Sequence, residues 1–211
     1  MKNKRVLGMI GALLAIILVA VVYPMLNNKN DANKADGTKK VKVGVLQLVS
    51  HPSLDEIYKG IQDGLAEEGY DKDKIEIEFL NAEGDQNKVA TMSKQLVQNN
   101  NDVLIGIATP SAQGLASATK DKPIVMGAIT DPVGANLVKD LKKPGGNITG
   151  VSDHNPTEQQ LKLIKELTPN VKTIGVLYST SEDNSKTQVE EFTKLAEKAG
   201  YKVVPYSVPS T

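Results

Sequence analysis

Histidine is scarce in the chain and cysteine is missing, which leaves little material for a catalytic centre built on an imidazole or a thiol. His51 and His154 are its two histidines, which lie far apart in the sequence and do not form one of the short pairings that bind metals. Cysteine is absent, which excludes disulfides, thiolate nucleophiles and cysteine-ligated metals. The sequence also lacks a Gly-x-Ser-x-Gly nucleophile motif and the glycine motifs that bind phosphates. We therefore predict a protein that is not an enzyme and that uses no cofactor or metal.

The segment Thr109-Pro110-Ser111-Ala112 is the one best suited to bind a small anion. A threonine followed by a proline predicts a helix start, with Thr109 as the N-cap and Pro110 at the first helical position. The free backbone N–H groups of that turn, together with the Ser111 hydroxyl at the mouth of a cleft, would bind a carboxylate. An ordinary capped helix start fits the same residues, so the sequence leaves both interpretations open.

Three further polar loops follow apolar runs, at Gln47–Ser53, Thr130–Gly134 and Ser152–Asn155. In open parallel sheets, ligands bind at the carboxyl ends of the strands, so these loops and Thr109–Gln113 are candidates for a binding site. His51 lies in the first of these loops, where it either contacts a ligand or is a solvated loop histidine.

Strand and helix patterns alternate from Val41 to Ser152, which predicts an α/β fold with a parallel sheet and right-handed crossovers. One helix is expected to open at Ser53, because Glu56 completes a capping box three residues later. A second helix is marked by apolar residues from Val89 to Val97, and a third opens at Thr109. The expected strands are Val41–Val49, Ile75–Leu80, Val103–Ala108, Ile124–Ile129 and Ile148–Ser152.

A second copy of the first strand and helix begins near residue 174. The run Val43–Leu46 matches Ile174–Leu177, and the helix-ending glycines Gly69 and Gly200 are separated by the same offset as these two runs. The shared offset predicts a duplicated α/β domain, although a chance match of two common segments is the alternative. The second copy, residues 153–211, is much shorter than the first. A parallel sheet of two strands cannot bury its own faces, so we expect these residues to be part of a lobe that a longer protein completes.

The start of the chain, through Lys40, has the pattern of a membrane anchor and a tether. Basic residues precede Val6–Leu26, an uncharged apolar run about as long as the roughly 20 helical residues that span a bilayer. A cleaved signal peptide is the alternative, but Ala20–Val22 is a poor cleavage site. We predict an anchor at residues 1–26 and a flexible linker at residues 27–40, rich in Asn and Lys. The positive-inside rule then gives a single-pass cell-membrane protein whose bulk is extracytoplasmic.

Two segments identify a family. Thr130–Ala135 and Pro144–Ser152 resemble the ABC-transporter substrate-binding family that contains the TrpX-like tryptophan- and tyrosine-binding proteins. Val43–Pro52 and Gly106–Ala112 are similar to two earlier ligand-facing loops of that family. The resemblance implies a type I periplasmic-binding-protein fold, with two Rossmann-like lobes and the ligand in the cleft between them. Residues 41–152 would form the first lobe, and residues 153–211 part of the second.

The resemblance also implies a function and a set of contacts. The protein would be the extracytoplasmic solute-binding component of an ABC importer that captures an aromatic amino acid (tryptophan, tyrosine or phenylalanine) and delivers it to a permease and ATPase. The implied contacts are Thr109, Ser111, backbone Ala112 and Thr130 for the ligand carboxylate, Asp153 for the ammonium group, and Gln47 and His51 for the side chain.

Two points remain open at this level. Asp153 fits a helix cap before Pro156 as well as it fits an ammonium contact. An extracytoplasmic sensor, or a binding lobe for a nucleoside or signalling molecule without transport, is the alternative to an importer component. Nucleic acid is not an expected partner, because Lys+Arg and Asp+Glu balance at 25 each and give no net positive charge.

Overall fold

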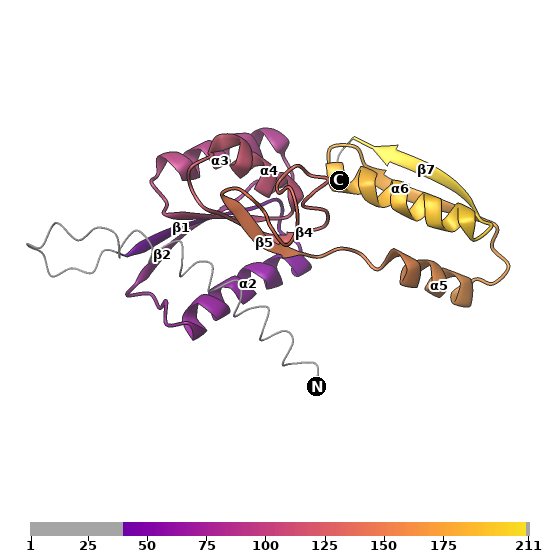
Figure 1. The fold of residues 1–211 in the computed structure, drawn as a ribbon, viewed down its shortest axis with the longest axis horizontal. Helices are drawn as coiled ribbons and strands as arrows, with labels where there is room; N and C mark the ends of the chain where they lie inside the picture. The colour runs from indigo at the N-terminus through magenta and orange to yellow at the C-terminus, as the bar shows by residue number, and fades with distance from the viewer. Residues whose placement is uncertain (1–39, 210–211) are drawn as a thin grey trace, which may run out of the picture.

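The computed structural model describes residues 40–209, whose strands form two separate parallel sheets (Figure 1). We refer to residues 41–152 as the five-stranded unit and to residues 157–208 as the two-stranded unit. The five-stranded unit contains β1 Val41–Gln47, α2 Pro52–Glu67, β2 Ile75–Asn81, α3 Gln86–Gln98, β3 Val103–Ile107, α4 Thr109–Ala118, β4 Ile124–Ile129 and β5 Ile148–Ser152. The two-stranded unit contains α5 Thr157–Leu167, β6 Thr173–Ser179, α6 Asp183–Lys198 and β7 Lys202–Val208.

The five-stranded sheet has the strand order β2-β1-β3-β4-β5, and every neighbouring pair is parallel. Helix α2 packs on one face, and α3 and α4 pack on the other, as Figure 1 shows. The central strands β1, β3 and β4 therefore contribute apolar side chains to two cores, which explains their nearly continuous apolar sequences. The core under α2 includes Val45, Ile105 and Leu65, and the core under α3 and α4 includes Leu46 and Leu115. The predicted α/β fold with a parallel sheet is confirmed.

The start of α2 differs from the prediction. The helix begins at Pro52, and His51 is its N-cap, with the Nδ1 atom accepting a hydrogen bond from Ser53 N at 3.3 Å. Proline fits the first helical position because its fixed φ is already helical and its missing N–H has no partner there to lose. The N-cap thus lies two residues earlier than expected, at His51 and not at Ser53, and the predicted capping box of Ser53 and Glu56 is wrong.

The two units repeat one βαβ arrangement. Helices α2 and α6 start and end at equivalent positions of the repeat, at the offset found in the sequence. Both helices are followed by a glycine in the left-handed region, Gly69 at φ 81° and Gly200 at φ 89°. A positive φ at this position costs least when the residue has no Cβ, so glycine ends both helices at low cost. The repeat found in the sequence is therefore also a repeat of the structure, because the strand, the helix and the helix-ending glycine recur at the same offset.

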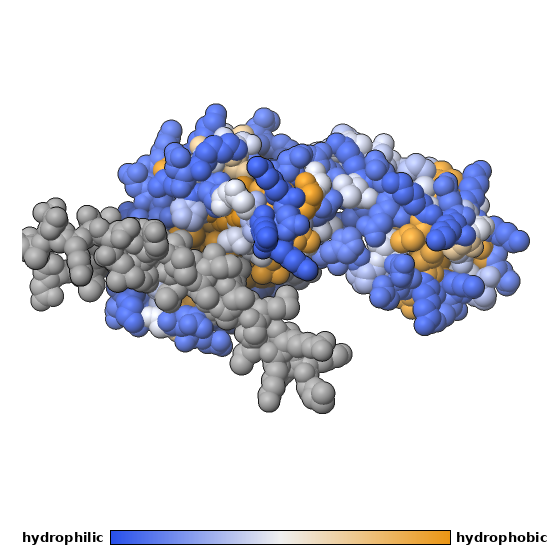
Figure 2. Space-filling view, viewed as in Figure 1, coloured by the Kyte–Doolittle hydropathy of each residue, from blue (hydrophilic) through white to orange (hydrophobic). Residues whose placement is uncertain are grey.

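The two-stranded unit exposes apolar side chains that a larger sheet would cover. Leu177 on β6 is 72% exposed and Tyr206 on β7 is 59% exposed. Leu163 and Leu167 on α5 are exposed as well. Figure 2 shows apolar surface on this unit, between polar regions. This exposure agrees with the expectation that two parallel strands cannot bury their own faces.

Between residues 40 and 209, no helix is long and apolar enough to cross a membrane. The predicted anchor at Val6–Leu26 lies outside the described residues, as does the predicted linker apart from Lys40.

Candidate functional site

The carboxyl ends of β1 and β3 meet at the point where the strand order reverses direction. Gln47, the last residue of β1, is in register with Ile107, the last residue of β3. The chain leaves β1 toward α2 on one face and leaves β3 toward α4 on the other. Open α/β sheets bind their ligands in the crevice at such a switch point. The sequence-predicted loops at Gln47 and Thr109 therefore lie side by side.

Helix α4 begins abruptly after β3. Ala108 takes the N-cap position with φ 73° and ψ 156°, and no side chain caps the helix. This positive φ is unfavourable for a residue with a Cβ, and such residues concentrate at functional sites. Because Ala108 makes the turn, Thr109 is the first helical residue and its side chain is buried. The prediction of Thr109 as a side-chain N-cap is wrong.

Close packing against β3 holds the first turn of α4 at the sheet edge. A Cβ on Gly106 would lie 2.7 Å from both the Cα and the N atom of Ala112. Backbone atoms cannot yield to such a contact, so this approach requires glycine. Gly106 thus lets the helix backbone reach the carboxyl end of the strand.

The first turn of α4 contains polar groups without partners. Ser111 is 0% exposed, and its Oγ has no hydrogen-bond partner within residues 40–209. The amides of Thr109 and Ser111 make no backbone hydrogen bond to the described residues either. A buried hydroxyl beside free helix amides is suited to an anion. Ser111 was expected at the mouth of a cleft, but it lies beneath the surface because α4 packs so closely on the sheet.

The backbone of Ala112 differs from its predicted role. Its amide donates to Ala108 O at 3.2 Å, the first hydrogen bond of the helix. Ala112 is the first residue of α4 with a carbonyl four positions before it to bond, so its N–H is not free for a ligand. The free amides lie one turn earlier, at Thr109 and Ser111.

Gln47 belongs to a polar network under the start of α2. Its side chain is 0% exposed, and Nε2 donates to Val49 O at 2.9 Å and to Asp55 Oδ1 at 2.6 Å. Ser50 Oγ donates to the other carboxylate oxygen of Asp55 at 3.0 Å. Both partners of Nε2 can only accept, so the amide orientation is determined, and Oε1 is left buried without a partner among the described residues. Asp55 escaped the sequence analysis because an acid in the first turn of a helix is common for its effect on the helix dipole.

The remaining predicted residues lie around this edge with different exposure. His51 is exposed and caps α2, while Thr130 is half-buried at the end of β4. Ser152 Oγ donates to Thr130 O at 3.4 Å, which ties the end of β5 to this loop. Ala128, two residues before Thr130, has φ 62°, so a second strained alanine lies at the same edge as Ala108.

Asp153 is exposed on the connection between the two units. Its backbone N donates to Ile129 O at 3.2 Å, which extends the β4–β5 pairing by one residue. Helix α5 begins at Thr157 with Pro156 at the N-cap position and no side-chain cap. The alternative role of Asp153 as a cap for α5 is therefore wrong, because the chain continues for three residues before the helix begins.

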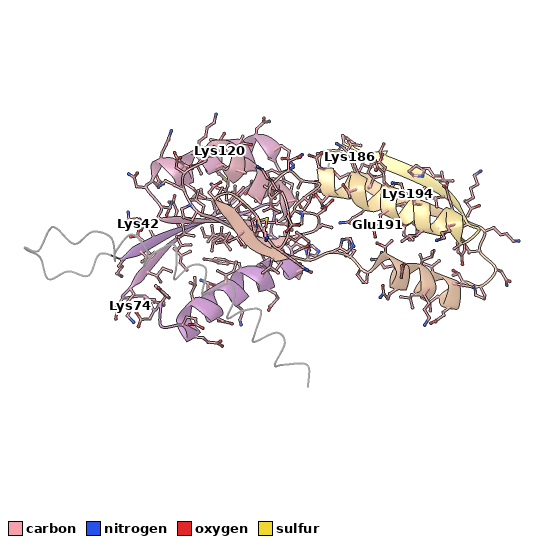
Figure 3. The ribbon with its side chains drawn as sticks, in the orientation of Figure 1. Lys42, Lys74, Lys120, Lys186, Glu191 and Lys194 are labelled. Carbon is pink, nitrogen blue, oxygen red and sulfur yellow. The ribbon has the colours of Figure 1, made fainter. Side chains whose placement is uncertain are left out.

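The two units contact each other through polar side chains that the sequence analysis missed. Gln86 Nε2 donates to Ser181 O at 3.4 Å, and Gln113 Nε2 donates to Asp183 Oδ2 at 3.3 Å. Lys186, at the end of α6 nearer the five-stranded unit (Figure 3), donates to Asp183 Oδ1 at 3.1 Å. The bonds from Lys186 and then Gln113 hold the pKa of Asp183 below its usual value. The repeat offset pointed to this region, because it places residues 182 and 183 opposite His51 and Pro52.

In the part of the chain that the structure describes, no group of three or more His, Asp or Glu side chains is arranged to hold a metal ion. The site thus consists of helix amides, a hydroxyl and an amide oxygen. Groups of these kinds can form hydrogen bonds with a small polar molecule.

The model of one protein family matches residues 42–211, and its description is ABC transporter substrate binding protein. The chain belongs to this family. Among curated proteins, a tyrosine-binding protein of Clostridioides difficile (strain R20291) is 43% identical over 214 residues, covering 100% of this chain and 62% of that protein. Among solved structures, an ABC domain in complex with L-Trp from Streptococcus pneumonia is 75% identical with a TM-score of 0.79, covering 81% of this chain and 58% of that one.

The likeness of fold extends to solved structures that are more distant in sequence. A leucine-binding protein of Thermotoga maritima has a TM-score of 0.60 at 18% identity, covering 81% of this chain and 49% of that one, a likeness that shows the fold alone. The chain spans about three fifths of the length of the tyrosine-binding and L-Trp-bound members of the family, at 62% and 58%.

Proposed function

We propose that the protein is the extracytoplasmic solute-binding component of an ABC importer and that it captures an aromatic amino acid. The observation that carries the proposal is the first turn of α4, where the buried Ser111 hydroxyl and the amides of Thr109 and Ser111 have no hydrogen-bond partner among residues 40–209. A ligand carboxylate satisfies these donors, and the positive end of the helix dipole adds to the attraction. Thr130, on the neighbouring loop, adds a hydroxyl to the same side.

Gln47 supports an aromatic ligand with a donor on its ring. Its Oε1 atom is a buried acceptor whose orientation Asp55 and Val49 determine. The indole N–H of tryptophan and the phenol O–H of tyrosine each supply a donor that this atom requires. Two family members are a tyrosine-binding protein and an ABC domain in complex with L-Trp, which agrees with this chemistry. His51, exposed at the start of α2, lines the same side-chain end.

The proposed mechanism is binding and delivery without bond making. The five-stranded unit forms one lobe and the two-stranded unit contributes to the other, with the ligand enclosed between them. Closure buries the ligand, and a permease and ATPase recognise the closed form. Family membership as a substrate-binding protein agrees with a non-catalytic role.

The test compares two serine variants of the intact protein. Ser111 and Ser93 are both fully buried, and neither hydroxyl has a hydrogen-bond partner among residues 40–209, but Ser93 lies on α3, within the α3–α4 contact. Ser111→Ala should weaken tryptophan, tyrosine and phenylalanine binding by about 1.5–3 kcal/mol, or roughly ten- to hundredfold. Ser93→Ala should leave the affinities unchanged. Titration calorimetry with the three amino acids measures both variants.

Unchanged affinity in Ser111→Ala would contradict the carboxylate site and move it toward Thr130 and its loop. Loss of affinity in both variants would assign the effect to general loosening of the five-stranded unit. Tight binding of a nucleoside in place of the amino acids would favour the alternative of a non-amino-acid receptor.

Attachment to the membrane is part of the proposal and rests on the sequence of Val6–Leu26. The protein should fractionate with membranes and retain its N-terminus. Sequencing of the mature N-terminus tests this, because a start near Tyr23 or beyond would identify a cleaved signal.

A further inference from the structure

The two-stranded unit reaches the five-stranded unit at residues 181–183. Gln86 on α3 donates to Ser181 O, and Gln113 on α4 donates to the side chain of Asp183, at 3.4 and 3.3 Å. Glu182 lies between these two contacts in the chain, so it lies at the boundary of the units. Gln113 is two residues beyond Ser111, which brings the start of α6 close to the first turn of α4. Figure 1 shows α6 pointing toward the five-stranded unit with this end.

Glu182 is an acid whose charge has no partner among the described residues. Its side chain is half-buried, and no donor or cation within residues 40–209 bonds to its carboxylate. It occupies the N-cap position of α6 without capping it. Burial raises the pKa of Glu182, because removal from water penalises the charged form. The neighbouring Asp183 differs, since Lys186 and Gln113 already bond to it. A half-buried, unpartnered carboxylate destabilises the free protein, and a cation placed against it removes that cost.

The internal repeat gives Glu182 a counterpart in the other unit. The repeat offset relates it to His51, and the two residues are the N-caps of α6 and α2. His51 accepts a hydrogen bond from Ser53 N, whereas Glu182 makes no such bond. In a pair of related units, both helix starts lie at the carboxyl ends of their sheets, where α/β proteins bind ligands. The repeat thus places Glu182 at a position where α/β proteins bind ligands. Unlike His51, Glu182 does not cap its helix, so its carboxylate is available to a ligand.

We propose that Glu182 binds the α-ammonium group of the amino-acid ligand, across from the first turn of α4 that binds the carboxylate. The inference rests on the proposed function. It adds a contact for the ammonium group of the ligand, which the first turn of α4 does not provide. An ammonium group supplies three donors and a positive charge to a carboxylate that has neither. The ligand carboxylate then contacts the helix amides of the five-stranded unit, and the ligand ammonium group contacts Glu182 of the two-stranded unit. Ligand binding joins the units because each holds one end of the same small molecule.

The test measures how strongly the protein distinguishes tryptophan from indole-3-propionate, which keeps the ring and the carboxylate and lacks the ammonium group. Titration calorimetry on the intact protein gives the ratio of the two affinities. Glu182→Gln keeps the shape and removes the charge, so the ratio should fall by roughly ten- to hundredfold, from weaker tryptophan binding alone. Glu190→Gln is the matched control, because Glu190 is an exposed acid on α6 whose side chain makes no hydrogen bond or ion pair to the described residues, and it should leave the ratio unchanged.

A thermal melt of the ligand-free protein separates a binding role from a structural one. Because the raised pKa reflects a cost of ionising Glu182 in the folded state, Glu182→Gln should melt at an equal or higher temperature at neutral pH. Lower affinity together with undiminished stability supports the proposal. An unchanged ratio in Glu182→Gln, or a ratio that falls as much in Glu190→Gln, would overturn it. If the unaltered protein binds neither ligand, the proposed function fails as well, which distinguishes that failure from misplacement of the ammonium alone.

Discussion

Leu46 and Leu177 occupy the same position of the internal repeat, yet one is 0% exposed and the other 72% exposed. Both lie on the first strand of a βαβ unit, within matching apolar runs. β1 pairs with β2 on one side and β3 on the other, and Leu46 packs in the core under α3 and α4. Within the described residues, β6 pairs with β7 alone. Equal local sequence thus gives equal local structure, while burial depends on the neighbours that surround it.

Replacing Leu46 and Leu177 by alanine should give the largest difference in stability between the two units. Leu46→Ala should lower the free energy of unfolding by about 2–5 kcal/mol, because it removes buried apolar contacts and leaves a cavity. Leu177→Ala should change it by less than about 0.5 kcal/mol, since water already surrounds that side chain. Chemical denaturation of both variants measures the difference. A comparable loss in Leu177→Ala would mean that the outer face of β6 is covered in the intact protein.

Gly44 and Gly175, which precede Leu46 and Leu177 by two positions, should give a smaller difference in stability when each is replaced by alanine. A Cβ on Gly44 would lie 2.9 Å from Asn101 Nδ2, and Asn101 is buried and bonded to Leu96 O. A Cβ on Gly175 would meet only the exposed ring of Tyr206, at 3.4 Å. Gly44→Ala should destabilise by about 1–3 kcal/mol through overpacking. Gly175→Ala should be neutral or stabilising by up to about 1 kcal/mol, because alanine restricts the unfolded chain more than glycine does. Thermal melts that show equal losses would contradict the comparison.

Alanine substitutions at the N-caps of α2 and α6 should give a still smaller difference in stability. His51→Ala removes the acceptor for Ser53 N and should destabilise by roughly 0.5–1 kcal/mol, the lower range for a cap. Glu182→Ala removes no cap bond, so it should not destabilise the ligand-free protein. Urea titration of the two variants in parallel compares the caps. Greater destabilisation by Glu182→Ala would indicate that Glu182 serves the fold.

The smallest expected effect is the pH dependence at the contact between the units. Asp183 has a pKa below its usual 3.8, chiefly through its hydrogen bond from Lys186 and then that from Gln113. The depressed pKa means that these bonds stabilise the folded protein above pH 3.8 and that the stabilisation is lost as the pH falls through the folded-state pKa. Asp183 is largely solvated, so screening keeps the effect below about 1 kcal/mol. Melting curves of Asp183→Asn across the acid range should show a slightly flatter decline than those of the unaltered protein. Identical declines would assign no stabilising role to this contact.

The sequence determined the features that depend on residues close together in the chain. The bounds of β4 and β5 match the predicted runs Ile124–Ile129 and Ile148–Ser152, because apolar side chains between turn residues specify a strand locally. The repeat offset came from the same kind of pattern. The family was also accessible, since its motifs are contiguous segments.

Only the tertiary structure decided which polar groups lack partners. Ser111 is buried because Gly106 lets α4 approach β3, and the free oxygen of Gln47 follows from the position of Asp55 on α2. Glu182 gained its place at the boundary from contacts with α3 and α4, which lie far away in sequence. Pattern and propensity describe a residue and its near neighbours. Whether a polar atom is satisfied depends on every group that packs against it, and those groups meet only when the chain has folded.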